Sequence, residues 1–260
     1  EGEARPPLEG AVAARFSGPM LRTILAHAGG ATPDTRDLTL VASDGFRATI
    51  ELEDVMGYPI LLATARDGER LERELGGPLL AVFPLGTYPH LAERYTESWW
   101  VYYVTHVVVG TETAHVRVGA HTVTAESLAA LPTRTITASV GYRVGWPSEP
   151  VVITGPTLDA VVATSGADLA GATSVRVLGI APITRSAERP TRVSAADAAS
   201  GDVILGLAYG DPPVPIPARL GGPVVLCFTD DVAARQNGHD WLTFVDELVV
   251  ERASADPAGD

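Results

Sequence analysis

Hydrophobic positions along the chain form short periodic segments, separated by turns rich in glycine, proline and aspartate. Residues 21–28 carry apolar side chains at helical spacing, and the pair Gly29-Gly30 that follows them is typical of a helix end. Residues 38–41 predict a strand, and the alternating pattern of residues 46–52 predicts a second strand after an Asp-Gly turn. Two further runs, rich in apolar or aromatic residues, are predicted to be strands: 78–84 and 99–109.

The second half of the chain shows the same succession of patterns after an additional leading segment. In that segment, residues 115–123 and 136–140 predict strands, and residues 124–131 predict a short helix with a threonine cap. The repeated helix is predicted at 156–164. The remaining strands are predicted at 174–178, 203–207, 224–228 and 241–250. Because strands dominate and helices are few, the predicted fold class is α+β, mainly β.

Three stretches of the first half recur in the second half, in the same order and at nearly constant spacing. They are FSGPMLRTILAHAG and ITGPTLDAVVATSG at 16–29 and 153–166, LGGPLLAVFP and LGGPVVLCFT at 75–84 and 220–229, and WVYYVTHVVV and WLTFVDELVV at 100–109 and 241–250. Ordered recurrence of this kind predicts two tandem copies of one fold. The expected parts are a first domain at 1–110 with an extended arm at 1–15, a second domain at 111–253, and a polar tail at 254–260.

Composition narrows the classes of partner. The chain has 260 residues, of which 46% are hydrophobic and 20% charged, enough for a core in each half. Its net charge is −13 without any Lys/Arg-rich cluster, which argues against nucleic acid and against an anionic membrane surface. No apolar run is long enough to span a bilayer, so no transmembrane segment is expected. The first residue is Glu1, which removal of a signal peptide or another trimming would explain.

Residues that commonly carry catalysis or bind metals are few, and no nucleotide-binding or hydrolase motif is present. The single cysteine, Cys227, lies in the apolar run PVVLCF and is predicted to be a buried thiol. His115 and His121 could face each other across a turn, but no third ligand is spaced near them, so no metal site is expected. The adjacent carboxylates Asp230-Asp231 and Asp246-Glu247 are expected in loops or on a solvated edge, because neighbours on a strand face opposite ways.

The order of motifs resembles that of the sulfite-oxidase-type (SUOX) molybdopterin-binding domain. In the first half the motifs are FSGPML at 16–21, DGF at 44–46, LLATARDGERL at 61–71, GGPLLAVFP at 76–84 and WWVYYVTHV at 99–107. In the second half TAESLAALP at 124–132 resembles the family's lead helix, whereas the DGF turn is replaced by Gly-Ile-Ala-Pro at 179–182. The resemblance spans most of residues 14–253 and implies two tandem SUOX domains.

The resemblance also implies a site. Enzymes of this family hold molybdenum through a pterin dithiolene and one cysteine thiolate, which lies in a C-V-x-G pattern of the lead segment. The matching stretch here is TASVG at 137–141, which puts Ser139 at the position of the ligand cysteine, and the first domain begins too late to have an equivalent. A hydroxyl is a hard, weakly acidic substitute for a thiolate. Arg143 and Arg185 are the basic candidates for the anionic pterin phosphate.

No cofactor and no catalytic residue are therefore expected, and the chain is interpreted as a non-catalytic accessory subunit. Trp99, Trp100, Tyr102 and Tyr103 place aromatic side chains on both faces of a predicted strand, so the outer members are expected to bind a partner protein. An open sheet edge beside them is expected to be covered by a partner chain or by the N-terminal arm.

The resemblance implies a periplasmic or extracytoplasmic setting and a partner in electron transport, either a membrane redox complex or a cytochrome. The alternative interpretation is a sulfite-oxidase-type oxidoreductase that retains molybdopterin.

Overall fold

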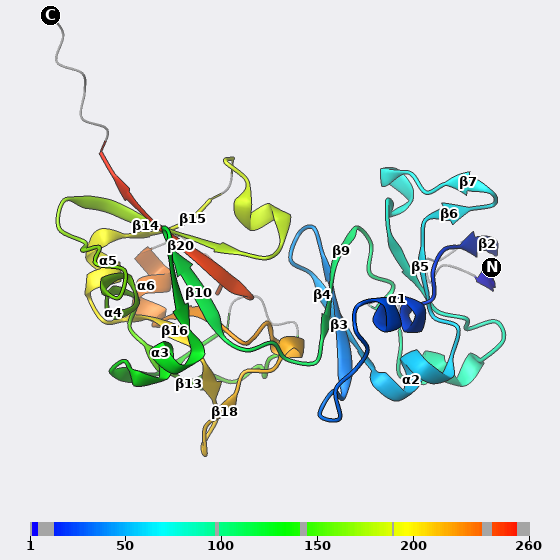
Figure 1. Ribbon diagram of the computed structural model, residues 1–260, viewed down its shortest axis with the longest axis horizontal. Helices are drawn as coiled ribbons and strands as arrows, with labels where there is room; N and C mark the ends of the chain where they lie inside the picture. The colour runs from blue at the N-terminus through cyan, green and yellow to red at the C-terminus, as the bar shows by residue number, and fades with distance from the viewer. Residues whose placement is uncertain are drawn as a thin grey trace, which may run out of the picture. The chain divides into compact units, whose positions relative to one another are not determined.

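The computed structural model describes residues 2–4 (backbone), 13–96, 99–140, 145–188, 190–235 and 241–253 (Figure 1). It divides into two compact units, residues 1–111 and 112–260. Both units combine helices and strands, with strands in the majority, in agreement with a mainly β fold. Among the described residues no helix has the length and apolar character needed to cross a bilayer.

The first unit is built from three small antiparallel sheets with short helices between them. Its elements are β1 (Gly2–Ala4), β2 (Ala14–Ser17), α1 (Leu21–His27), β3 (Asp37–Ala42), β4 (Arg47–Glu51), α2 (Leu52–Gly57), β5 (Leu61–Ala63), β6 (Ala65–Arg66), β7 (Glu69–Arg70), η1 (Arg73–Leu75), β8 (Leu80–Val82), η2 (Pro89–Glu93) and β9 (Val104–Val109). The strand orders are β1-β2-β6-β7, β4-β3-β9 and β5-β8. Figure 1 shows β9, β3 and β4 as one sheet.

The sequence pattern predicted only some of these elements, and two of the predicted strands differ from expectation. Helix α1 buries Leu21 and Leu25, which are one turn apart, as the spacing of its apolar residues predicts. The predicted strand at 46–52 ends at Glu51, and the next residues form the unpredicted helix α2. The predicted strand at 99–109 is too long, because Tyr103 has a φ of 55° and the extended backbone of β9 begins only after it.

The second unit contains more strands than the first. Its elements are β10 (His115–Val118), β11 (His121–Thr124), α3 (Ala125–Ala130), β12 (Thr133–Ala138), β13 (Val151–Pro156), α4 (Leu158–Ala163), β14 (Ala172–Gly179), η4 (Pro182–Arg185), β15 (Thr191–Ser194), α5 (Ala195–Ala199), β16 (Val203–Gly206), β17 (Ala208–Tyr209), β18 (Val214–Pro215), η5 (Ala218–Leu220), β19 (Val225–Phe228), α6 (Asp230–Arg235) and β20 (Val245–Arg252). The strand orders are β11-β10-β20-β14-β15, β12-β13-β17-β18 and β16-β19.

The two units share an order of elements and a set of strand pairings. The pairs β3·β4, β3·β9, β5·β8, β2·β6 and β6·β7 of the first unit correspond to β14·β15, β14·β20, β16·β19, β13·β17 and β17·β18 of the second. Gly76 and Gly221 end η1 and η5 with φ values of 93° and 90°. Tyr103 and Phe244, with φ values of 55° and 52°, precede the equivalent strands β9 and β20.

The arm before β2 completes a sheet of the first unit. Strand β1 pairs with β2 so that Ala4 lies opposite Ala14, and β12 pairs with β13 in the equivalent register, with Ala138 opposite Val151. The expectation that the first unit has no counterpart of the leading segment is therefore wrong for this strand. The expected open edge at β2 is covered by the N-terminal arm. The hairpin β10–β11 has no counterpart among the described residues of the first unit.

Each unit has a hydrophobic core of its own. In the first unit, buried residues from β2 through the start of β9 form one cluster, with Phe16, Leu40 and Trp100 among its members. In the second unit, buried residues from β10 through β20 form the other cluster, which includes Trp146 and Cys227. The candidate site residues Ser139 and Arg185 lie on strand and helix ends outside this second cluster.

Candidate functional site

Ser139 is exposed and directly follows β12. Its backbone N–H donates a 3.0 Å hydrogen bond to Oδ1 of Asp230. Asp230 begins helix α6, where Asp230 and Asp231 occupy the first turn. These two carboxylates were expected in a loop or on a solvated edge. Both are exposed, but they lie in a helix, where acidic side chains suit the first turn because they face its positive end. The backbone of Ser139 therefore lies against a carboxylate.

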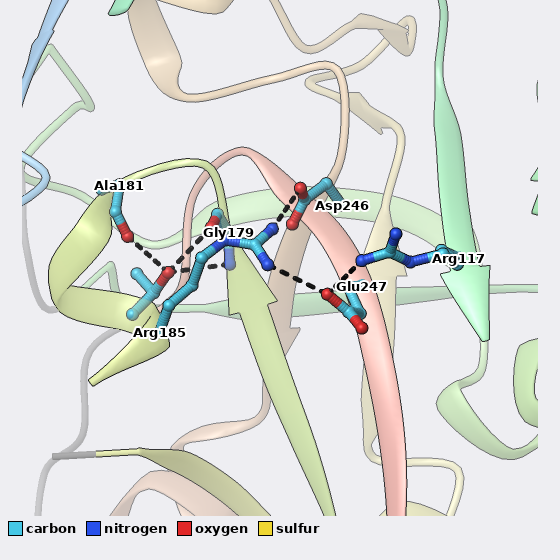
Figure 2. Close-up of polar contacts among 7 residues, drawn as sticks. Arg117, Gly179, Ala181, Arg185, Asp246 and Glu247 are labelled. Carbon is cyan, nitrogen blue, oxygen red and sulfur yellow. Dashed lines mark hydrogen bonds and ion pairs between the residues drawn. The ribbon is translucent and has the colours of Figure 1, made fainter. Parts of the chain in front are cut away.

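Arg185 ends η4, and its side chain contacts the first residues of β20, the last strand of the second unit (Figure 2). Its guanidinium pairs with Asp246 and, at 2.9 Å, with Oε2 of Glu247, while its Nε donates to the carbonyl of Gly179 at 3.1 Å. Arg117 of β10 also pairs with Glu247, so that Figure 2 shows this carboxylate between two guanidinium groups. The positive charge of Arg185 is therefore balanced by carboxylates of its own chain.

The expected placement of Asp246-Glu247 in a loop or on a solvated edge is wrong. Both residues belong to β20, which lies between β10 and β14 in its sheet. Both contact the same arginine at a register shift in the pairing of β14 with β20, where Leu178 lies opposite Glu247 and Gly179 opposite Val245. Burial raises the pKa of Asp246; Arg185 opposes this rise, and the adjacent Glu247 adds to it. Burial also acts to raise the pKa of Glu247, but the hydrogen bonds from Arg117 and Arg185 outweigh it and hold the pKa below its ordinary value.

Of the other two residues considered for a cofactor, Cys227 is described and offers no accessible thiolate. Cys227 is fully buried in β19, its thiol donates to the carbonyl of Val225, and burial raises its pKa well above the ordinary value. Arg143 lies outside the described residues. A molybdenum dithiolene asks for a thiolate ligand and for cationic or backbone donors around its phosphate, whereas the matching positions here offer an exposed hydroxyl beside Asp230 and a neutralised arginine. The residues described do not fit that group.

The aromatic residues expected to bind a partner do not share one surface. Trp100 is 1% exposed and packs edge-to-face on Phe16, so it belongs to the core. The expectation that Trp100 binds a partner protein is therefore wrong. Trp99 is half-buried and donates its indole N–H to the carbonyl of Thr49 at 2.7 Å. Tyr102 and Tyr103 are half-buried and lie beside each other, with ring centroids 6.3 Å apart.

Histidines do not assemble a metal site in the described part of the chain, where no group of three or more His, Cys, Asp or Glu side chains could hold an ion. His115 lies opposite Thr124 in the β10–β11 hairpin, and His121 lies opposite Val118 at its other end. The predicted single strand at 115–123 is thus a hairpin whose turn brings neither histidine to the other. The absence of a metal stays a prediction.

Sequence reasoning overlooked one buried aromatic residue with a defined partner. Trp146 is 6% exposed and donates its indole N–H to the carbonyl of Leu220 at 3.0 Å. Its ring packs edge-to-face on Trp241 and on Tyr209, with centroid distances of 6.0 Å and 5.5 Å. The signal available in the sequence was a lone tryptophan between glycine and proline, in a segment otherwise predicted to be a loop.

Comparison with known proteins adds one match. The family described as "Oxidoreductase molybdopterin binding domain" matches residues 7–88, which is most of the first unit and none of the second. No curated protein matches the chain. Over residues 7–88 the chain is thus similar to a molybdopterin-binding domain, in agreement with the sulfite-oxidase-like motifs of its first half.

Proposed function

We propose that the chain is a non-catalytic, protein-binding accessory subunit, built from two degenerate copies of a sulfite-oxidase-type domain that hold no molybdenum cofactor. The observation that carries this proposal is the environment of Ser139. The residue at the position of the family's ligand cysteine is an exposed serine, and the carboxylate of Asp230 binds its backbone N–H at 3.0 Å. A hard hydroxyl beside a carboxylate disfavours both a soft metal ligand and an anionic pterin.

The shared pairings of the two units support the idea of two copies. The support extends to single residues, because Gly18 and Gly155 both lie against the backbone of the neighbouring strand pair, near the carbonyls of Leu62 and Leu205. Equivalent glycines at equivalent contacts are what duplication of one domain would leave. The family match covers the first copy alone, and the second has diverged further in its turns.

The partner and its setting follow from the resemblance and from charge. Family members work with redox partners outside the cytoplasm, so we assign the chain to an extracytoplasmic, membrane-associated electron-transfer complex, with a membrane redox protein or a cytochrome as partner. With a net charge of −13, the chain would be steered toward a partner that presents a basic face.

The alternative is a molybdopterin-dependent oxidoreductase of sulfite-oxidase type. It is favoured by the family match at residues 7–88, because that family is defined by binding of the cofactor. When bound, molybdopterin would supply two-electron redox chemistry at the metal. Arg185 would have to leave Asp246 and Glu247 to serve as a phosphate ligand.

Metal analysis separates the two functions. The full chain is purified from a host that makes molybdopterin, and molybdenum and oxidised pterin are quantified beside a Ser139→Cys variant. We expect neither protein to carry stoichiometric molybdenum, since the carboxylate of Asp230 would still lie against the backbone of residue 139. Stoichiometric molybdenum with pterin in the unmodified chain would establish the alternative. Its appearance only in the Ser139→Cys variant would show that the pocket is intact and that the ligand alone has been lost.

A further inference from the structure

One pair of equivalent leucines differs sharply in exposure between the two units. Leu75 ends η1 and Leu220 ends η5, and each precedes a left-handed glycine, Gly76 or Gly221. The two turns therefore present the same backbone and point the leucine the same way. Leu75 is nevertheless 45% exposed, whereas Leu220 is 2% exposed. A segment of the second unit therefore covers this position, and the described residues of the first unit leave Leu75 half exposed.

The cover in the second unit is the segment between β12 and β13. Trp146 donates its indole N–H to the Leu220 carbonyl at 3.0 Å. A Cβ added at Gly145 would lie 3.3 Å from Leu220 Cδ2, so the backbone of the segment also touches the leucine. Trp146 is only 6% exposed in this place, and its ring lies edge-to-face with Trp241. One tryptophan therefore covers the leucine turn and satisfies its carbonyl.

The first unit keeps the surroundings of this position without the tryptophan. Tyr102 and Tyr103 correspond to Thr243 and Phe244, and the Tyr102 ring packs where a Cβ of Gly76 would be. The guanidinium of Arg73 lies over the Tyr103 ring, 5.2 Å from its centroid. The arm that precedes β2 reads EGEARPPLEGAVA and contains no aromatic residue, so it cannot repeat the contact made by Trp146.

We propose that the surface formed by Leu75, Tyr102, Tyr103 and Arg73, here called the Leu75 patch, binds a tryptophan-bearing segment of a partner protein. The incoming indole packs on Leu75 and donates its N–H to the Leu75 carbonyl, as Trp146 does at Leu220. Tryptophan suits such a place because it combines a large apolar face with one hydrogen-bond donor. This inference deepens the proposed function and rests on its protein-binding part.

A second copy of this chain does not offer the required side chain. Trp100, Trp146 and Trp241 are 1%, 6% and 5% exposed, so they lie in cores. The indole N–H of Trp99 is already donated to the carbonyl of Thr49. All four tryptophans of the chain are thus committed to internal contacts, which makes a different protein the occupant of the Leu75 patch.

Peptide binding to the full chain tests the proposal. The probe is a fluorescein-labelled peptide of residues 145–150, GWPSEP, and its matched control carries alanine in place of the tryptophan; binding is followed by fluorescence anisotropy. We expect saturable binding with a Kd of about 1 mM or lower, and a Kd about ten times higher for the alanine peptide. Leu75→Ser should weaken binding of GWPSEP by about the same factor. Met56→Ser, which changes another exposed apolar residue of the first unit, should leave it unchanged.

Hydrogen exchange locates the contact. Saturating GWPSEP should slow exchange in residues 73–76 and 102–104 and leave residues 218–221 unaffected, because Trp146 already covers the latter. Equal binding of the two peptides, no saturable binding, or equal effects of Leu75→Ser and Met56→Ser would each overturn the Leu75 patch. None of these outcomes bears on molybdenum content, so failure of this inference is distinguishable from failure of the proposed function.

Discussion

Two glycines allow backbone segments to touch at places where any side chain would collide. A Cβ at Gly18 would lie 2.3 Å from the carbonyl oxygen of Leu62, and a Cβ at Gly155 would lie 1.9 Å from that of Leu205. Both contacts join the end of the first repeated strand to the short two-stranded sheet of its unit. The neighbouring atoms are backbone, so they cannot move aside as a side-chain end could.

Gly18→Ala and Gly155→Ala should therefore each lower the free energy of unfolding by about 2 kcal/mol or more, through forced separation of the strands. The matched control is Gly57→Ala, because Gly57 ends helix α2 with open space where its Cβ would be. That change should be neutral or stabilise by up to about 1 kcal/mol. Urea unfolding of the three variants gives the comparison, and equal stability of all three would show that the close contacts at Gly18 and Gly155 are not constraining.

A buried carboxylate of the first unit supports a second residue-level prediction. Asp54, with a side chain only 3% exposed, accepts a hydrogen bond from the Tyr95 hydroxyl and one of 3.0 Å from Arg94. Burial, followed by the hydrogen bond to Asp54, raises the pKa of Tyr95. Asp54→Asn should destabilise by about 2 kcal/mol, because charge-assisted hydrogen bonds are replaced by weaker ones.

The control for Asp54 lies on the same helix. Glu53 is exposed and occupies the same first turn of α2, so Glu53→Gln should change stability by less than about 0.5 kcal/mol. Thermal unfolding followed by circular dichroism measures both variants. If Asp54→Asn lowered stability no more than Glu53→Gln, the hydrogen bonds of the Asp54 carboxylate would not contribute measurably to stability.

The candidate site could be read from the sequence only as far as residue types. The serine at position 139 and the lone thiol of Cys227 follow from motif and composition, and burial of Cys227 is as predicted. The partners of Ser139 and Arg185 did not follow, because Asp230 and Asp246 lie far away in sequence and meet them only through the sheet topology. Ion pairs between residues so far apart in the sequence leave no local sequence pattern from which they could be predicted.

At the scale of elements, regular runs were predictable and their ends were not. Helix α3 lies where its threonine cap indicated, with Thr124 accepting from the Ser127 N–H. Helix α2 was not predicted, and only its first residue, Leu52, was included in a predicted strand, because six residues are too few to show a helical pattern clearly. The left-handed Tyr103 shortens the last strand of the first unit, and left-handed backbone at a tyrosine has no sequence signature.

The ion pairs between Arg185 of η4 and the carboxylates of β20 predict how stability depends on pH. Glu247 has a lowered pKa in the folded chain, so it contributes stability above its unfolded pKa that is lost as pH falls through the folded value. Asp246 has a raised pKa and acts in the opposite sense, because the folded chain binds its proton more readily. Between roughly pH 3 and 5, Glu247→Gln should flatten the fall of unfolding free energy with acid, and Asp246→Asn should steepen it.

Urea unfolding at several pH values in this range measures both slopes. The charged groups that face these carboxylates are Arg185 from η4 and Arg117 from β10, which both variants retain. A steeper slope for Glu247→Gln, or a flatter one for Asp246→Asn, would contradict the assignment of opposite shifts.

At the scale of the molecule, the two separate cores predict separate folding competence. Every member of the second cluster lies between Val116 and Leu248, so a fragment of residues 112–253 contains the whole of it. This fragment should unfold cooperatively in urea and show a near-ultraviolet circular dichroism signal from the Trp146–Trp241 pair. A gradual transition without near-ultraviolet signal would mean that the second core depends on the first unit.

The burial of Cys227 makes the chain its own reporter of partial opening. The thiol is the only one in the chain, it is fully buried between β16 and its neighbours, and its raised pKa keeps it from reacting in the closed state. A thiol-specific reagent added to the native protein therefore modifies it only when the second unit opens, and the labelling rate at rising reagent concentration approaches the rate of that opening. The first unit has no cysteine and is not labelled, so the labelling rate reports on opening of the second unit without any engineered probe.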